Sequence, residues 1–255
     1  MKKWIHLLLI FLLFGCSNSA EPKTTLTISA AASMKDVLSS IKKQYEAKHP
    51  SVQLSFNFAS TGTLKKQIEQ GAPVDLFISA SPDVFKELKN KGFIIPRQNN
   101  HLVYNELVLI ASKTITTPIH SPEDLTTKNI QTIAIGIPET VPAGAYAKQW
   151  LEAVHVWDKV KKKLILAKDV REVLTYVESG NAEAGIVYRT DALSSKKIDI
   201  AAQANHHLFK EPIVYEAGVI QSSPHKKQAK DFLYYLQSNE TKKIFKEFGF
   251  ILEER

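Results

Sequence analysis

The chain has 255 residues, a formal net charge of +7 at pH 7 and a single cysteine. Its length exceeds that of a typical single core, so one large domain or two lobes is expected. The excess lysines lie in short clusters such as 159–163 without interleaved aromatic residues, which favours solvated helix faces over a nucleic-acid surface.

The N-terminus carries two lysines, an apolar run at 4–14 and the sequence Leu-Phe-Gly-Cys at 13–16. The run is far shorter than the ~20 residues that a bilayer-spanning helix needs, and it is typical of a secretory signal. The leucine three residues before Cys16 resembles the lipobox of bacterial lipoproteins. It implies that residues 1–15 are removed as a signal peptide and that Cys16 is lipidated. The alternative is an ordinary signal peptide with an incidental cysteine.

Export with a lipid on Cys16 would place the mature protein on the extracytoplasmic face of the cell membrane. No thiol would then remain for a disulfide, a zinc site or a cysteine nucleophile. No second apolar stretch of the sequence is long enough to span a bilayer, so the rest of the chain is expected to be soluble.

Residues 16–25 are small and polar and predict a flexible tether. A first set of alternating strands and amphipathic helices follows. Strands are expected at 26–31, 52–58 and 74–79, and helices at 33–48, at 61–70 and from Ser81 onward. Repeated units of this kind predict parallel strands that are covered by helices on both faces.

The pattern then restarts. Strands are expected at 102–111, 132–137, 164–167, 185–188 and 212–220, and helices after 121–124, 141–144, 169–172 and 223. Two consecutive sets predict an α/β fold of two lobes joined by a hinge, with parallel-rich sheets flanked by helices. We expect lobe 1 to comprise 26–103 and 214–255, and lobe 2 to comprise 104–213.

Signatures of catalysis are missing from the sequence, which contains no Gly-x-Ser-x-Gly, phosphate-loop, dinucleotide-binding or His-Glu-x-x-His motif. His206 and His207 could suggest a metal site, but adjacent histidines in a polar loop are more typical of solvated surface. We therefore expect no catalytic residue, no cofactor and no cation-binding site.

Small residues and hydroxyls mark the starts of four predicted helices. They occur in Ala-Ala-Ala-Ser at 30–33, Ala-Ser-Thr-Gly-Thr at 59–63, Val-Pro-Ala-Gly at 141–144 and Lys-Asp-Val at 168–170. Ligands of α/β sheets bind at the carboxyl ends of strands, where the N–H groups of helix N-termini point. Four such starts in one cleft could hold a dianion without lysine or arginine. Taken alone, Ser33 is more typical of a helix cap, with Asp36 as the acid of a capping box.

Seven segments extend this pattern along the chain. They are 29–33, 58–64, 71–80, 138–147, 169–171, 185–188 and 245–250. In this order they resemble the molybdate-binding proteins of bacterial ABC transporters, over nearly the whole mature chain. The resemblance implies a two-lobed fold of the type II periplasmic-binding-protein class with a ligand cleft between the lobes. It also implies a monomeric receptor that delivers its solute to a membrane permease driven by a cytoplasmic ATPase.

The resemblance also implies the binding residues. The hydroxyls would come from Ser33, from Thr61 with Ser60 as its neighbour, and from Tyr188, and the backbone amides from Ala143 and Val170. Considered alone, Tyr188 would be a strand aromatic whose hydroxyl is satisfied elsewhere.

Neutral donors suit an oxyanion that arrives fully deprotonated, because every oxygen must accept a hydrogen bond. Molybdate and tungstate meet this requirement, and hydrogen phosphate does not. Sulfate is also unprotonated, but it is smaller and would leave stretched bonds in a cavity built for molybdate.

Three alternatives remain at this point. The protein could be a receptor for sulfate or another oxyanion, or an extracytoplasmic enzyme that uses Tyr188 and Asp169 as acid and base. It could also be the sensing half of a regulator, although the lipoprotein signal and the missing DNA-binding module argue against this.

Overall fold

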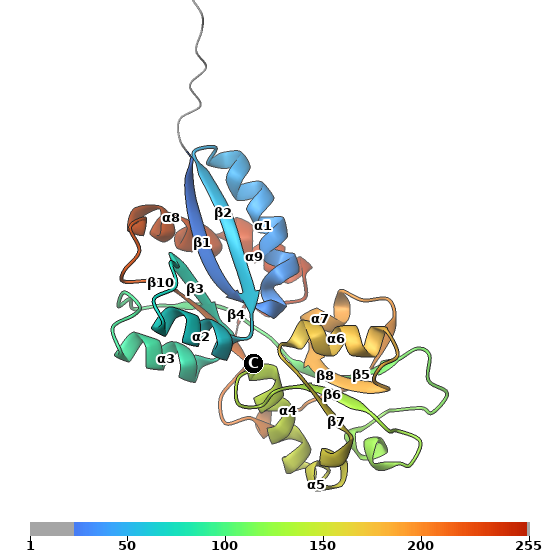
Figure 1. Cartoon of the computed structure of the whole chain (residues 1–255). Helices are drawn as coiled ribbons and strands as arrows, with labels where there is room; N and C mark the ends of the chain where they lie inside the picture. Colours follow the sequence, from blue (N-terminus) through green and yellow to red (C-terminus); the bar gives the residue numbers. More distant parts are fainter. Residues whose placement is uncertain (1–22, 254–255) are drawn as a thin grey trace, which may run out of the picture.

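Two five-stranded sheets, one in each lobe, organise the part of the chain that the structure describes, residues 23–253 (Figure 1). The structure is a computed structural model. The predicted signal peptide, Cys16 and most of the predicted tether lie outside the described residues. The first strand begins at Thr24, two residues earlier than the sequence pattern indicated.

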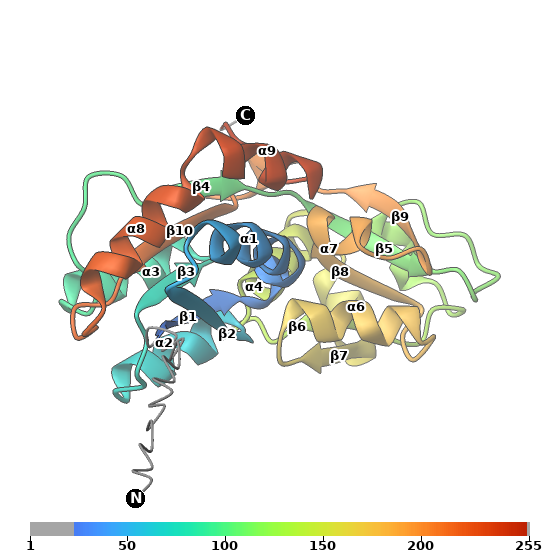
Figure 2. The ribbon, with the colours of Figure 1, turned by 90° about the horizontal axis from the view of Figure 1, so that it is seen from above.

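The sheet of the first lobe has the strand order β2-β1-β3-β10-β4. Its strands are β1 (Thr24–Ala31), β2 (Val52–Ala59), β3 (Leu76–Ser79), β4 (His101–Tyr104) and β10 (Val214–Val219). Strands β2, β1 and β3 run parallel, whereas β10 is antiparallel to both of its neighbours. One face is covered by α1 (Lys35–Lys48), α8 (Lys226–Leu236) and α9 (Asn239–Glu247), and the other by α2 (Thr61–Glu69) and α3 (Pro82–Asn90) (Figure 2).

The sheet of the second lobe has the order β7-β6-β8-β5-β9. Its strands are β5 (Leu107–Ser112), β6 (Ile133–Gly136), β7 (Leu164–Ala167), β8 (Ala184–Tyr188) and β9 (Ile198–Gln203). Helices α4 (Pro142–Ala153) and α5 (Trp157–Val160) cover one face, and α6 (Val170–Glu178) and α7 (Arg189–Leu193) the other. The 3-10 turns are η1 (Ala32–Met34), η2 (Pro122–Thr126), η3 (Lys161–Lys163) and η4 (His206–Leu208).

Local sequence explains most of these elements. The strands β3, β5 and β8 are buried along their whole length, which is why each is a continuous apolar run rather than an alternating one. Helix α3 begins as predicted, because the Ser81 hydroxyl accepts a hydrogen bond from the Val84 amide and Pro82 takes the first helical position. Among the described residues, no helix is long and apolar enough to cross a bilayer.

The predicted strand at 102–111 is two strands that belong to different sheets. Strand β4 ends at Tyr104 in the first lobe, and β5 begins at Leu107 in the second. The prediction of one strand was wrong because the buried residues of β4, Leu102 and Val103, are as apolar as those of β5, and only Asn105 and Glu106 interrupt the run. Both sheets are also mixed, since β5 and β10 run antiparallel to their neighbours after the chain has crossed between the lobes.

The chain crosses between the lobes at 105–106 and again at 204–213. Hydrogen bonds tie these crossings together at both ends. The Asn105 amide donates to the Ile213 carbonyl, and the Ala204 amide donates to the Leu107 carbonyl, both at 2.9 Å. The two-lobed α/β architecture expected from the sequence is therefore present, with a paired connection between the lobes.

Gly144 should be essential to the packing of α4 on the second sheet. A Cβ atom at this position would lie 2.0 Å from the carbonyl oxygen of Gly136 in β6, and backbone atoms cannot move aside as a flexible side chain can. We expect Gly144→Ala to lower the free energy of unfolding by about 1–3 kcal/mol, measured by urea denaturation. Ala145→Ser, in the same helical turn, is the control. A Gly144→Ala variant as stable as the parent would contradict this packing.

Candidate functional site

A small cavity lies between the lobes, where β1, β2, β6 and β7 end and the next helix or 3-10 turn begins. The space open to the centre of a water-sized molecule is about 10 Å³, close to the minimum that holds one water. The cavity is therefore narrow, and a compact ion suits it better than a sugar, an amino acid or a peptide.

All six residues that the sequence analysis assigned to a binding site line this cavity. Lobe 1 supplies Ser33, Ser60 and Thr61, and lobe 2 supplies Ala143, Val170 and Tyr188. They come from five segments that are distant in the sequence, and they meet because each lies at the end of a strand or in the turn or helix that follows it. The structure thus places the predicted residues together, at the contact between the two lobes.

Tyr188 ends β8 and is almost completely buried, with 2% of its surface exposed. Among the described residues, its hydroxyl has no hydrogen-bond partner. Burial raises the pKa of Tyr188 well above its ordinary value, so the hydroxyl keeps its proton. A buried donor without a partner costs about 1–3 kcal/mol. An acceptor atom of a ligand in the cavity would remove this cost.

Thr61 is the first residue of α2 and is fully buried. Its Oγ1 accepts a hydrogen bond from the Ala80 amide at 3.1 Å, which leaves the hydroxyl proton for the cavity. Ser60 is used differently, because its Oγ caps α2 by accepting from the Thr63 amide and also bonds the Thr63 hydroxyl at 2.8 Å. Thr61 is therefore the donor of this pair, and Ser60 fixes the helix start.

The capping role considered for Ser33 is wrong. Ser33 lies in η1, and no side chain caps either this turn or α1. The 3-10 turn moves the start of α1 to Lys35, so the Ser33 hydroxyl bonds Tyr215 at 2.7 Å instead. Asp36 closes no capping box, and its carboxylate contacts the Arg171 guanidinium of the other lobe at 2.9 Å.

Backbone amides complete the donor set. Val170 is the first residue of α6, and Ala143 is the second residue of α4 after Pro142. Amides in the first turn of a helix have no acceptor within it, and the helix dipole favours an anion there. The cavity thus receives hydroxyl and amide donors from both lobes.

Charged side chains do not supply the cavity with donors. Among the described residues, its lining contains no lysine and no arginine, and Asp169 is the only charged residue there. Asp169 Oδ1 caps α6 by accepting from the amides of Arg171 at 2.9 Å and Glu172 at 3.0 Å. The acid–base pair of Asp169 and Tyr188 considered above lacks support, since Asp169 Oδ1 is engaged as the cap of α6 and burial makes the Tyr188 phenol a weaker acid than a free tyrosine.

The two lobes touch directly beside the cavity. The Gly62 amide in α2 donates to the Thr140 carbonyl at 3.0 Å across the lobes. A Cβ atom on Gly62 would lie 2.7 Å from that oxygen, so a residue larger than glycine would force the backbones apart. The ion pair of Arg171 with Asp36 adds a second contact between the lobes.

Comparison with known proteins shows the family to which this chain belongs. The family described as bacterial extracellular solute-binding protein matches residues 26–251. The chain belongs to this family. YvgL of Bacillus subtilis (strain 168), provisionally named as an ABC transporter substrate-binding lipoprotein, is 47% identical over 98% of this chain and 97% of its own.

Two further relatives carry names that refer to molybdenum. The molybdate-binding protein ModA of Haemophilus influenzae is 37% identical over 98% of this chain and 99% of its own. Among solved structures, the substrate-binding domain assigned to a molybdenum ABC transporter of Clostridium difficile is 40% identical. It covers 91% of this chain and 100% of its own, with a TM-score of 0.69. The family resemblance and the two-lobed fold expected from the sequence are therefore confirmed.

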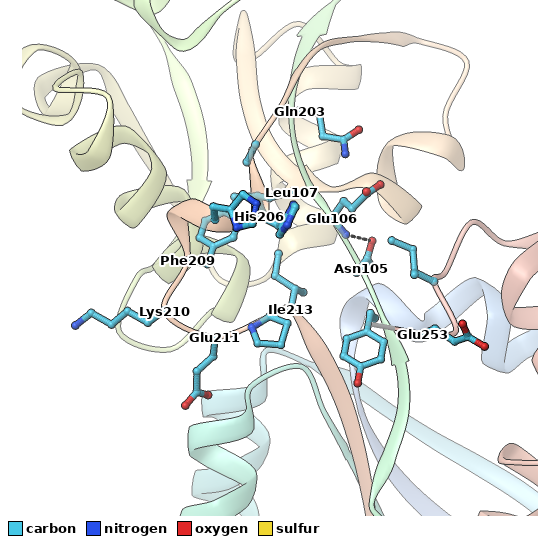
Figure 3. A pocket seen from close by; sticks show the side chains of 15 residues that line it. Asn105, Glu106, Leu107, Gln203, His206, Phe209, Lys210, Glu211, Ile213 and Glu253 are labelled. Carbon is cyan, nitrogen blue, oxygen red and sulfur yellow. Dashed lines mark hydrogen bonds between the residues drawn. The ribbon is translucent and has the colours of Figure 1, made fainter. Parts of the chain in front are cut away.

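A larger pocket of this solute-binding protein, about 280 Å³, lies at the crossings between the lobes (Figure 3). Its lining includes Glu106, Glu211 and Glu253, and such carboxylates disfavour an anion. His206 and His207 also line it and are exposed. The described residues contain no group of three or more His, Cys, Asp or Glu side chains suited to a metal ion. The smaller cavity, with its converging donors, is the candidate solute site.

The residues that hydrogen-bond the donor hydroxyls were not predicted from the sequence. Tyr215 and Asn105 do not line the solute cavity, but Tyr215 bonds Ser33 and Asn105 bonds Tyr215. Ala80 does line it, and its amide bonds Thr61. Asn105 had a detectable signal, since it interrupts an apolar run. Tyr215 had none, because a tyrosine in an apolar strand is ordinary.

Asp191, whose buried carboxyl contacts Arg171, should make the free energy of unfolding depend on pH. It is fully buried in α7, its Oδ1 lies 3.3 Å from Arg171, and its Oδ2 has no partner among the described residues. Burial raises the pKa of Asp191 to about 7 from 3.8, against the opposing charge of Arg171. The neutral carboxyl thus favours the folded state most at low pH, and this contribution is lost as the pH rises through about 7.

We expect Asp191→Asn to remove this dependence, because the amide stays neutral. Relative to the variant, the parent should lose about 1.4 kcal/mol of unfolding free energy per pH unit between these two pKa values. Urea denaturation at several pH values measures the slope, and Asp199→Asn, at an exposed position, is the control. Parallel pH profiles of parent and Asp191→Asn would show that the carboxyl is ionised throughout.

Proposed function

We propose that this solute-binding protein captures molybdate or tungstate outside the cytoplasm and delivers it to an ABC importer. The observation that carries the proposal is that Tyr188, which lines a cavity with neutral donors, has a buried hydroxyl without a hydrogen-bond partner among the described residues. The names of ModA and of the Clostridium difficile domain agree with this ligand.

The chemistry of the donors selects the protonation state of the ligand. Hydroxyls of Ser33, Thr61 and Tyr188 and amides of Ala143 and Val170 would each donate to an oxygen atom. Molybdate and tungstate are dianions without protons at neutral pH, so each of their oxygens accepts. Hydrogen phosphate would need an acceptor, and sulfate is smaller than molybdate. Molybdate and tungstate have nearly the same size, so the site should take both.

The remaining roles follow from the same proposal. The protein would act as a monomer and pass its oxyanion to a permease driven by a cytoplasmic ATPase. A lipid on Cys16 would hold it on the extracytoplasmic face of the cell membrane. The lipoprotein in the name of YvgL supports this anchor.

Titration calorimetry of the mature domain against four oxyanions tests the ligand. We expect molybdate and tungstate to bind with similar affinity, and sulfate and phosphate to bind far more weakly. Tighter binding of sulfate or phosphate, or no heat with molybdate, would overturn the proposal.

Ser33→Ala and Tyr188→Phe test the assigned donors. Each should lose one hydrogen bond to a charged ligand, about 1.5–3 kcal/mol, or a ten- to hundred-fold weaker affinity for molybdate. Ser39→Ala, which removes an exposed hydroxyl of α1, is the control, and melting curves verify folding. Folded variants that bind molybdate as the parent does would place the ligand elsewhere.

The anchor is tested by Cys16→Ser expressed with its own signal sequence. Without the lipid, most of the membrane affinity is lost, so the variant should appear in the soluble fraction after cell fractionation. A variant that still sediments with the membranes would refute the lipoprotein assignment.

A further inference from the structure

Behind Ser33 lies a buried chain of hydrogen bonds that reaches into the second lobe. Ser33 Oγ lies 2.7 Å from Tyr215 Oη, and Asn105 Nδ2 donates to the same Oη at 3.3 Å. Asn105 Nδ2 also donates to Thr190 Oγ1 at 2.9 Å. Each of these four residues is less than one-tenth exposed. The chain joins β10, the first crossing between the lobes and α7.

The direction of the protons along this chain is fixed by Asn105. Its Oδ1 accepts from the Glu106 amide at 2.9 Å (Figure 3), so the two protons of its Nδ2 face Tyr215 and Thr190. Tyr215 Oη therefore accepts a hydrogen bond from Asn105, and its own proton is left to donate. Among the described residues, Ser33 Oγ is the remaining hydrogen-bond partner of that hydroxyl.

Ser33 is consequently the acceptor in its bond with Tyr215, and its own proton is free for the cavity. The Ala80 amide has the same effect on Thr61, because it occupies the oxygen from behind. The two hydroxyls differ in one respect. The Ala80 amide that bonds Thr61 cannot be removed by changing a side chain. The group that bonds Ser33 is the phenol of Tyr215, which a substitution can remove.

We propose that Tyr215 and Asn105 are positioning residues that hold Ser33 as a hydrogen-bond donor and thereby exclude oxyanions that carry a proton. This inference rests on the proposed function. Without the Tyr215 hydroxyl, the Ser33 hydroxyl could turn and accept a hydrogen bond from the O–H group of hydrogen phosphate or hydrogen arsenate. Discrimination between protonated and unprotonated oxyanions would then fall.

Tyr215→Phe tests this inference with little disturbance of packing. The ring contacts of Tyr215 with Phe250, at a centroid separation of 5.5 Å, and with Tyr188, at 6.0 Å, can be kept by phenylalanine. At neutral pH, affinities for molybdate, arsenate and phosphate are measured by calorimetry, the weaker two by displacement of molybdate. We expect the preference for molybdate over arsenate and phosphate to fall about tenfold.

A double-mutant cycle separates positioning from a general structural role. In a Ser33→Ala background, Tyr215→Phe should leave the preference unchanged, because the hydroxyl that it orients is missing. Tyr45→Phe, in the buried core of lobe 1, is the matched control. An unchanged preference in Tyr215→Phe, or an equal fall in both backgrounds, would overturn the inference alone. Failure of the parent to bind molybdate would overturn the proposed function and this inference together.

Discussion

A buried dianion without a cationic partner requires a hydrogen-bond donor for every oxygen. Each donor must have no other acceptor that competes for its proton. The rest of this structure depends on that constraint. Tyr188 meets it because its hydroxyl has no partner in the part of the chain that the structure describes. Thr61 and Ser33 meet it because other groups bond their oxygens from behind. Helix N-termini meet it because their first amides have no acceptor within the helix.

The fold brings these donors together through the ends of its strands. Parallel strands place the starts of successive helices at one edge of each sheet, and the two edges face each other across the cavity. The paired crossings near Asn105 and Ala204 keep the lobes in register. Gly62, which has no side chain, lets the backbone of α2 contact the backbone of Thr140 in the other lobe. The proposed anion site is therefore a property of the interface between the lobes and of neither lobe alone.

Much of this could be predicted from the sequence, because the relevant signals are local. Apolar runs and Ser81 with Pro82 indicated the elements, and small residues and hydroxyls indicated the helix starts at the cleft. The six predicted binding residues, Tyr188 above all, came from the family resemblance. The division of 102–111 between two sheets could not be predicted, because the buried residues of β4 are as apolar as those of β5. The bond between Ser33 and Tyr215 joins residues far apart in the chain, and no local pattern encodes it. Which hydroxyl donates is settled only by such contacts.

The dependence of molybdate affinity on pH above neutrality tests the central claim most directly. If neutral donors alone hold the dianion, the dissociation constant should stay constant from about pH 8 to about pH 10, where free tyrosine and lysine side chains begin to titrate. Burial raises the pKa of Tyr188 well above this range, so it should keep its proton throughout. A dissociation constant that rises about tenfold per pH unit would show that a titrating cation or phenol holds the ligand, and would contradict the account.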